Sequence, residues 1–151
     1  MSANVTRRTA LALGAAAFAA GFAGLKATPA LSAEIDDIIK EFTGGKEPEM
    51  GRVAIDAPEI AENGNTVPVG INVDSPMTAD DHVASVLILA AGNPRPGVAT
   101  FHFSPLSGAA TAQTRMRLAK TQDIVAIAKM SNGSLFMDKR TVKVTIGGCG
   151  G

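Results

Sequence analysis

The side chain best suited to covalent chemistry is Cys149, the only cysteine in the 151-residue sequence. Two glycines precede it and two follow it, so residues 147–151 read Gly-Gly-Cys-Gly-Gly. Glycine has no Cβ, visits positive φ freely and loses the most conformational entropy when it is ordered. We therefore expect residues 147–151 to form a flexible, narrow arm, which would reach roughly 16 Å if fully extended. Such an arm could carry one sulfur atom into the cleft of another protein.

Nothing near Cys149 in the sequence would activate its thiol. An unperturbed thiol has a pKa of about 8.5, so little of it is thiolate at neutral pH. A catalytic nucleophile also needs a base and an orienting group on rigid elements. No histidine lies nearby, and Lys139, Arg140 and Lys143 precede the arm on what we expect to be a strand. The pattern favours a carrier whose client enzymes supply the activation, and no catalytic residue is predicted.

Two other interpretations of Cys149 stay open at this stage. Chain ends are often loose, and a leftover cysteine in an exported protein can form an intermolecular disulfide. The main alternative is a structural or interaction sandwich domain, cross-linked as a homodimer through its tail cysteine. A weaker alternative is an enzyme with Cys149 as its nucleophile.

The C-terminal pentapeptide resembles that of the SoxY family, the sulfur carriers of bacterial thiosulfate oxidation, at all five positions. The resemblance implies that Cys149 binds sulfur covalently, as an S-thiosulfonate or persulfide, and that no other cofactor is needed. Gly147, Gly148, Gly150 and Gly151 would form the flexible arm. The resemblance also implies an immunoglobulin-like β-sandwich, a SoxZ-like subunit in a heterodimer, and transient docking to Sox enzymes that load, oxidise and hydrolyse the bound sulfur.

The N-terminal segment is predicted to be an export signal. Arg7 and Arg8 precede a run of Ala, Leu, Gly and Phe that is too short and too weakly apolar for a stable membrane anchor. A core helix is the alternative, but an arginine pair before such a run is more typical of the twin-arginine pathway. We expect residues 1–33 to be the signal, with cleavage after Ala30 or Ala33. The mature protein would then be periplasmic, exported in a folded state together with a partner that lacks its own signal.

The remaining residues are enough for one domain, predicted here as 34–146. Tryptophan and tyrosine are absent, so the core must be mostly aliphatic. A single cysteine excludes an internal disulfide and a multi-cysteine metal site. The two histidines, His82 and His102, lie far apart in the sequence, and no metal site is predicted. No basic cluster alternates with aromatic residues, which argues against nucleic-acid binding.

Charge is unevenly distributed along the chain, although the formal net charge is zero. Residues 34–81 carry 12 acidic and three basic side chains, whereas residues 82–151 carry eight basic and two acidic ones. If the basic half flanks the arm, its field would favour anions such as thiosulfate or a cysteine-bound sulfonate. If folding mixes the two halves, the surface would be evenly charged instead.

A short helix is predicted over residues 32–42. Ser32 is a suitable N-cap, and acidic residues in the first turn complement the helix dipole. Apolar residues recur at helical spacing and form one stripe: Ile35, Ile38, Ile39 and Phe42. Such a stripe more often packs on its own domain than on a partner.

The pattern after Pro48 is typical of strands. Apolar residues alternate over 67–73, where Pro68 suggests an edge strand. Residues 83–91 are apolar on both faces, as in a strand that is central or covered by a partner. Asn132-Gly133 predicts a hairpin with a type I′ turn. Other strands are expected at 52–56, 98–103, 111–118, 123–130 and 135–139, and residues 140–146 either continue the last of these or follow a bend as a further strand. About seven strands with such turns indicate an all-β, immunoglobulin-like sandwich with a short N-terminal helix and a C-terminal arm.

Overall fold

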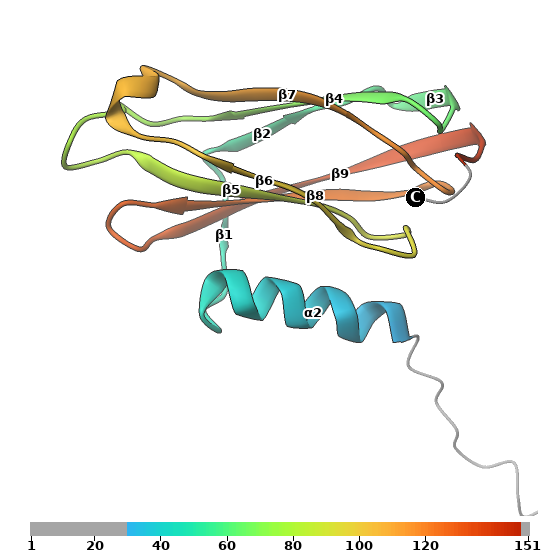
Figure 1. The fold of residues 1–151 in the computed structure, drawn as a ribbon, viewed down its shortest axis with the longest axis horizontal. Coiled ribbons are helices and arrows are strands. Elements are labelled where there is room, and N and C mark those ends of the chain that lie inside the picture. Colours follow the sequence, from blue (N-terminus) through green and yellow to red (C-terminus); the bar gives the residue numbers. More distant parts are fainter. Residues whose placement is uncertain (1–29, 149–151) are drawn as a thin grey trace, which may run out of the picture.

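The computed structural model describes residues 30–148, which form two β-sheets packed face to face and one helix against the larger sheet (Figure 1). This arrangement confirms the predicted β-sandwich with an N-terminal helix. In chain order the elements are α2 (Ala30–Thr43), β1 (Glu49–Met50), β2 (Val53–Asp56), β3 (Ile60–Asn63), β4 (Val67–Val73), β5 (Val83–Ala90), β6 (Gly97–His102), the 3₁₀ turn η1 (Pro105–Ser107), β7 (Ala110–Met116), β8 (Gln122–Met130) and β9 (Leu135–Ile146). No helix in this range is long and apolar enough to cross a membrane.

The larger sheet has the order β1-β9-β8-β5-β6, and the smaller one has the order β2-β4-β7. β9 is one long strand, so residues 140–146 continue the strand that begins at Leu135, and its pairing with β8 runs from Leu135 to Val142 without interruption. The short strands β1 and β3 both pair with β9 in parallel, β1 near its start and β3 near its end. Neither was foreseen, since two to four residues are too few to show an alternating pattern.

The core between the sheets is aliphatic, as the composition predicts. On β4 the alternating residues Val67, Val69, Ile71 and Val73 are all at most 3% exposed and point inward. They pack against the inner face of the larger sheet, where the fully buried residues include Val86, Ile88, Ile124, Ala126, Ala128 and Val142. Burying one such side chain contributes about 1.5–3 kcal/mol.

The outer face of the larger sheet is covered by α2. The helix packs its apolar stripe, Ile35, Ile38, Ile39 and Phe42, on a second cluster formed by Leu87, Leu89, Val125 and Ile127. β5 therefore lies in the middle of the sheet, between β8 and β6, with one face in the sandwich and the other under the helix. Its two-sided apolar pattern is explained within the chain, which decides in favour of a central strand.

Three local predictions were wrong for identifiable reasons. α2 begins at Ala30, so Ser32 lies inside the helix rather than at its N-cap. Pro68 lies on β4, the central strand of the smaller sheet, not on an edge. β2 pairs only with the stretch of β4 from Gly70 to Val73, so the missing N–H of Pro68 costs no bond to β2.

The third correction concerns the turn between β8 and β9, whose hairpin itself is confirmed. The amide of Gly133 donates to the carbonyl oxygen of Met130, and the amide of Met130 donates to the carbonyl oxygen of Ser134. Only Gly133 among the turn residues has a positive φ, at 83°. This is a type I turn closed by a glycine bulge, whereas a type I′ turn would need a positive φ at two central residues.

One side-chain bond joins the two sheets at the open edge of β2. The amide of Ile55 donates to Oδ2 of Asp138, on β9, at 2.9 Å. An edge strand presents unpaired N–H groups that invite pairing with another chain. Asp138 satisfies one of these groups and ties the smaller sheet to the larger one.

Candidate functional site

The residues predicted to act lie at two ends of the chain. Arg7 and Arg8 of the predicted export signal lie outside the described residues, as do Cys149, Gly150 and Gly151. Gly147 and Gly148 are described, and they fix the place from which the thiol-bearing segment leaves the domain. The candidate site is therefore built from these two glycines and the loops that contact them.

β9 brings the chain to one end of the sandwich, where three backbone bonds follow one another (Figure 1). The amide of Gly64, in the turn after β3, donates to the carbonyl oxygen of Ile146 at 2.7 Å. The carbonyl oxygen of Gly64 accepts a bond from the amide of Leu118 at 2.8 Å. The amide of Gly148 then donates to the carbonyl oxygen of Leu118 at 2.9 Å. The end of β9 is thereby tied to two loops.

The backbones in this place are too close for any larger side chain. A Cβ on Gly148 would lie 2.6 Å from the carbonyl oxygen of Gly64 and 2.9 Å from its carbon. A Cβ on Gly147 would collide with the carbonyl oxygen of Ala119, and one on Gly64 with that of Leu118. None of the three glycines has a positive φ, so it is close approach that requires glycine here. We call these five residues, Gly64, Leu118, Ala119, Gly147 and Gly148, the arm anchor.

The anchor gives the first two glycines of the pentapeptide a role that differs from the expected one. Gly148 is buried and hydrogen-bonded, and Gly147 rests on Ala119. In this structure Gly147 and Gly148 therefore form the base of the predicted arm. The flexible arm beyond them stays a prediction.

A buried polar pair supports the loop that holds Gly148. Asn93, in the loop after β5, is 3% exposed, and Gln122, at the start of β8, is 7% exposed. Nδ2 of Asn93 donates to the carbonyl oxygen of Arg117 at 2.7 Å, and its Oδ1 accepts from the amide of Ala119 at 3.0 Å. Nε2 of Gln122 donates to the same Oδ1 at 2.8 Å and to the carbonyl oxygen of Lys120 at 3.1 Å. The loop 117–121 is thus fixed from behind by side chains.

Sequence reasoning missed Gly64, Asn93 and Gln122. Asn93 lies in a proline-rich stretch between two predicted strands, and Gln122 lies just before another predicted strand. Their roles arise because the loops that follow β3, β5 and β7 lie together at one end of the sandwich. Asn93 and Gln122 stand out because they are among the few buried polar residues and each has several hydrogen-bond partners. The amino-acid sequence alone shows neither their burial nor their partners.

Loops at the two ends of the sandwich differ in charge. The loops beside the arm anchor, residues 64–66, 91–96 and 117–121, contain Arg95, Arg117 and Lys120 and no carboxylate. The β4–β5 loop, at the opposite end, contains Asp74, Asp80 and Asp81. The loops that surround the arm anchor are therefore basic.

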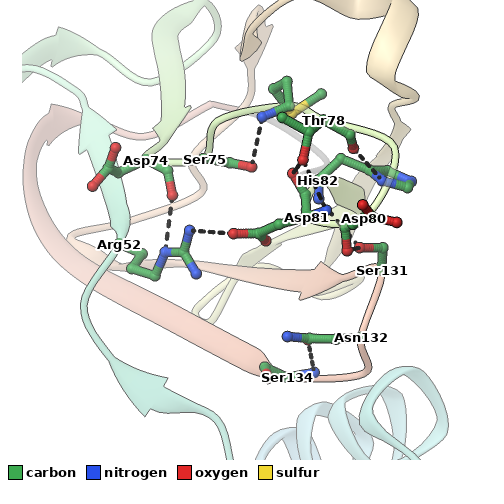
Figure 2. Close-up of polar contacts among 11 residues, drawn as sticks. Arg52, Asp74, Ser75, Thr78, Asp80, Asp81, His82, Ser131, Asn132 and Ser134 are labelled. Atoms are coloured by element: carbon green, nitrogen blue, oxygen red, sulfur yellow. Dashed lines mark hydrogen bonds and ion pairs between the residues drawn. The ribbon is translucent and has the colours of Figure 1, made fainter.

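Figure 2 shows the polar contacts at the opposite end. Arg52 has a φ of 57°. Its Nε donates to the carbonyl oxygen of Asp74 at 2.9 Å, and its Nη2 lies 3.8 Å from Oδ2 of Asp81. Its guanidinium also lies 5.2 Å from the ring centre of Phe136. The ring of His82 contacts the carbonyl oxygen of Thr78 through Nδ1, at 3.0 Å. These contacts fix the long β4–β5 loop and account for the strained backbone at Arg52.

The two histidines lie near the same end of β5, since His102 pairs with Ser85, three residues after His82. His82 belongs to the polar cluster just described, and His102 lies on the edge strand β6. Among residues 30–148, no three His, Cys, Asp or Glu side chains lie close enough together to hold a metal ion.

A hollow of about 570 Å³ lies on the outer face of the smaller sheet. Asp56, Gly70, Gln113 and Arg115 are among its lining residues, and none of the arm-anchor residues is. The hollow is shallow and open, so it supplies no enclosed pocket beside the arm.

This fold is an immunoglobulin-like sandwich whose last strand ends in an anchored glycine pair, and the single cysteine of the sequence comes directly after that pair. The family model for SoxY, "Sulfur oxidation protein SoxY", matches residues 39–149. The chain belongs to the SoxY family. The match extends to Cys149, the residue that the anchor precedes.

Solved structures agree with this assignment. The sulfur carrier protein SoxY from Chlorobium limicola f thiosulfatophilum is 35% identical, with a TM-score of 0.62, and the match covers 76% of this chain and 99% of that one. A superoxide reductase (neelaredoxin) from Ignicoccus hospitalis matches with a TM-score of 0.56 at 19% identity, covering 62% of this chain and 80% of that one. At that identity the second likeness shows the fold alone. No match was found among the curated proteins.

Proposed function

We propose that this protein is a non-enzymatic sulfur carrier that binds thiosulfate-derived sulfur covalently on Cys149 and presents it to other enzymes. The observation that carries the proposal is the place of Cys149. It is the only cysteine, it is the last residue of the SoxY match, and it follows a buried, hydrogen-bonded glycine. The 35% identical relative is described as a sulfur carrier protein, which supports the same role here.

The chemistry that fits this role needs only a thiol on this chain. Joining thiosulfate to Cys149 forms an S–S bond, releases the thiol proton and passes two electrons to an acceptor held by the loading enzyme. Hydrolysis then breaks the bond between the outer sulfur and the sulfonate, so that water and the S-thiosulfonate give hydrogen sulfate and a cysteine persulfide. Because client enzymes provide the oxidant and the catalytic groups, the carrier itself needs neither.

The charge of the loops around the arm anchor supports an anionic cargo. Thiosulfate, an S-thiosulfonate and a deprotonated persulfide are all negative, and Arg95, Arg117 and Lys120 lie in the loops beside the anchor. A field of one sign favours counter-ions locally and speeds their encounter, an effect that falls as salt increases. The same field would suit client clefts that are themselves acidic around their entrance.

We further propose that the protein acts in the periplasm as a heterodimer with a SoxZ-like subunit. The twin-arginine motif at Arg7 and Arg8 supports export of folded cargo, and a partner without its own signal could travel with it. A stable interface of this kind should bury over about 1,000 Å². Because β5 is covered on both faces by this chain, the partner would have to use another surface.

Intact-mass analysis of the native protein under non-reducing conditions tests the carrier role against its rivals. A carrier should show sulfur adducts that a thiol reductant removes, and a Cys149→Ser variant should show none. A quantitative covalent dimer would instead support a structural domain cross-linked through its tail. Turnover of a thiol substrate by this chain alone would support an enzyme, and either result would overturn the proposal.

A further inference from the structure

We infer that Gly64, Asn93 and Gln122 are positioning residues, which hold Gly147 and Gly148 as the fixed base of the arm so that the thiol is presented beside the basic loops around the anchor. The inference rests on the proposed carrier function and adds the part of the fold that sets where the carrier thiol starts. In this inference, Gly147 and Gly148 dock against the domain instead of adding flexible length to the arm.

The first argument is steric. Glycine is the residue of choice where a chain must be flexible, but also where two backbones come close. At Gly148 an added Cβ would lie 2.6 Å from a backbone oxygen, and backbone cannot move aside as a flexible side chain can. By contrast, a Cβ on Gly97 would meet only the end of the Ile38 side chain, at 3.9 Å. The anchor positions therefore require glycine because neighbouring backbone atoms leave no room for a Cβ.

The second argument is the reach that the anchor permits. Consecutive Cα atoms are about 3.8 Å apart across a trans peptide, so a fixed Gly148 places the Cα of Cys149 within that distance. A free arm that starts at Gly147 would let the same atom range over roughly 10 Å. The anchor therefore confines the thiol to the neighbourhood of loops 64–66 and 117–121 as long as it is closed.

The third argument concerns the support behind the anchor. Oδ1 of Asn93 accepts two bonds, and its Nδ2 donates to the carbonyl oxygen of Arg117, while both polar atoms of Gln122 are also bonded. Removing one partner of a buried pair leaves donors and acceptors without bonds, which is costly. The loop that bears Leu118 and Ala119 should then shift, and the hydrogen bond to Gly148 should weaken with it. Nothing else in the described residues requires two buried amides at this place.

The experiment measures the anchor directly in the full-length protein, by amide hydrogen exchange followed by NMR. In the unaltered protein, the amide of Gly148 should exchange at least about tenfold more slowly than a free peptide amide, since local opening is needed first. Gly64→Ala and Asn93→Ala should remove this protection while the amide of Ile127, in the centre of β8, stays protected. Gly97→Ala is the matched control and should leave Gly148 protected.

A nitroxide on Cys149 provides a second readout, because the chain has no other cysteine to label. In the unaltered protein, relaxation enhancement should be concentrated on amides 64–66 and 117–121. It should spread to other loops in Gly64→Ala. If Asn93→Ala does not fold, Gly64→Ala and the unaltered chain still decide the question.

Exchange of the Gly148 amide at the free-peptide rate in the unaltered protein would overturn the inference, as would full protection retained in both anchor variants. These results are separate from the test of the carrier role. A protein that forms reducible sulfur adducts on Cys149 but has an unprotected Gly148 would refute the anchor alone. A protected Gly148 without any adduct would refute the carrier role instead.

Discussion

The amide of Gly148 and the carbonyl oxygen of Leu118 are hydrogen-bonded at 2.9 Å, so the residue just before Cys149 is held by the loop between β7 and β8. This bond connects the two parts of the account. The family assignment makes Cys149 the residue of interest, and the bond determines where the segment that carries it leaves the domain.

Replacing Gly148 should separate delivery of the thiol from its intrinsic reactivity. Gly148→Pro removes the N–H that donates to Leu118 and fixes φ near −65°, so the anchor should open and the arm should stiffen. We expect slower loading by client enzymes and little change in the rate of alkylation by a small reagent. Measuring both rates checks this.

Gly150→Val is the comparison for that experiment. It leaves the anchor residues unchanged and should slow enzymatic loading only by widening the strip that enters a client's cleft. If loading and alkylation fell in parallel in both variants, the glycines would be tuning thiol chemistry. If neither rate fell, the predicted arm would have no role in delivery.

The bond between Ile55 and Asp138 predicts a loss of stability when the carboxylate is removed. Hydrogen bonds to charged groups contribute about 1.5–3 kcal/mol, and this one is only partly buried, so Asp138→Ala should cost about 1.5 kcal/mol. Chemical denaturation monitored by circular dichroism measures the change. Asp56→Ala, at an exposed position on β2, is the control and should change stability by less than about 0.5 kcal/mol. Equal effects in the two variants would mean that Asp138 does not join the sheets.

The cover provided by α2 predicts the effect of truncating Phe42. This half-buried ring packs on the cluster that contains Leu87 and Ile127, so Phe42→Ala should destabilise the domain by about 2 kcal/mol, below the 3–5 kcal/mol of a fully buried phenylalanine. Binding of a hydrophobic dye should increase as the outer face of the sheet becomes accessible. Glu41→Ala, on the exposed side of the same helix, should change neither quantity. An unchanged melting temperature in Phe42→Ala would show that the helix does not protect the sheet.

Export should depend on the arginine pair. Replacing Arg7 and Arg8 with lysine keeps the charge but removes the residues that define the twin-arginine motif. Cell fractionation should then find both this protein and its co-exported partner in the cytoplasm. Normal periplasmic accumulation of the double variant would contradict the assigned route and the co-export with it.

Much of the fold could be predicted because its main elements have a clear period. The alternation from Val67 to Val73 and the helical stripe ending at Phe42 each identify one inward face. The structure buries the first face and packs the second, half-buried, on the larger sheet. The turn around Gly133 was predicted in place but not in type, because Asn-Gly suits more than one hairpin loop. The short strand β3 could not be predicted, since it is defined only by its pairing with β9.

The candidate site likewise has one part that could be predicted from the sequence and one part that could not. Cys149 could be singled out because it is unique and because its glycine neighbours are unusual. The contact of Gly148 with Gly64 could not, because it joins residues 84 positions apart through backbone atoms, which carry no sequence signal. Nor could the sequence decide whether its charge asymmetry would survive folding. That answer depends on which loops share one end of the sandwich.

The most direct test of the central claim is to locate the sulfur. The protein should be purified under non-reducing conditions from its host grown on thiosulfate, digested, and its C-terminal peptide analysed by tandem mass spectrometry. We predict a sulfur adduct on Cys149 that a thiol reductant removes, and no adduct in a Cys149→Ser variant that melts at nearly the same temperature. An unmodified Cys149 in every preparation, or adducts of equal abundance in the serine variant, would contradict the carrier function.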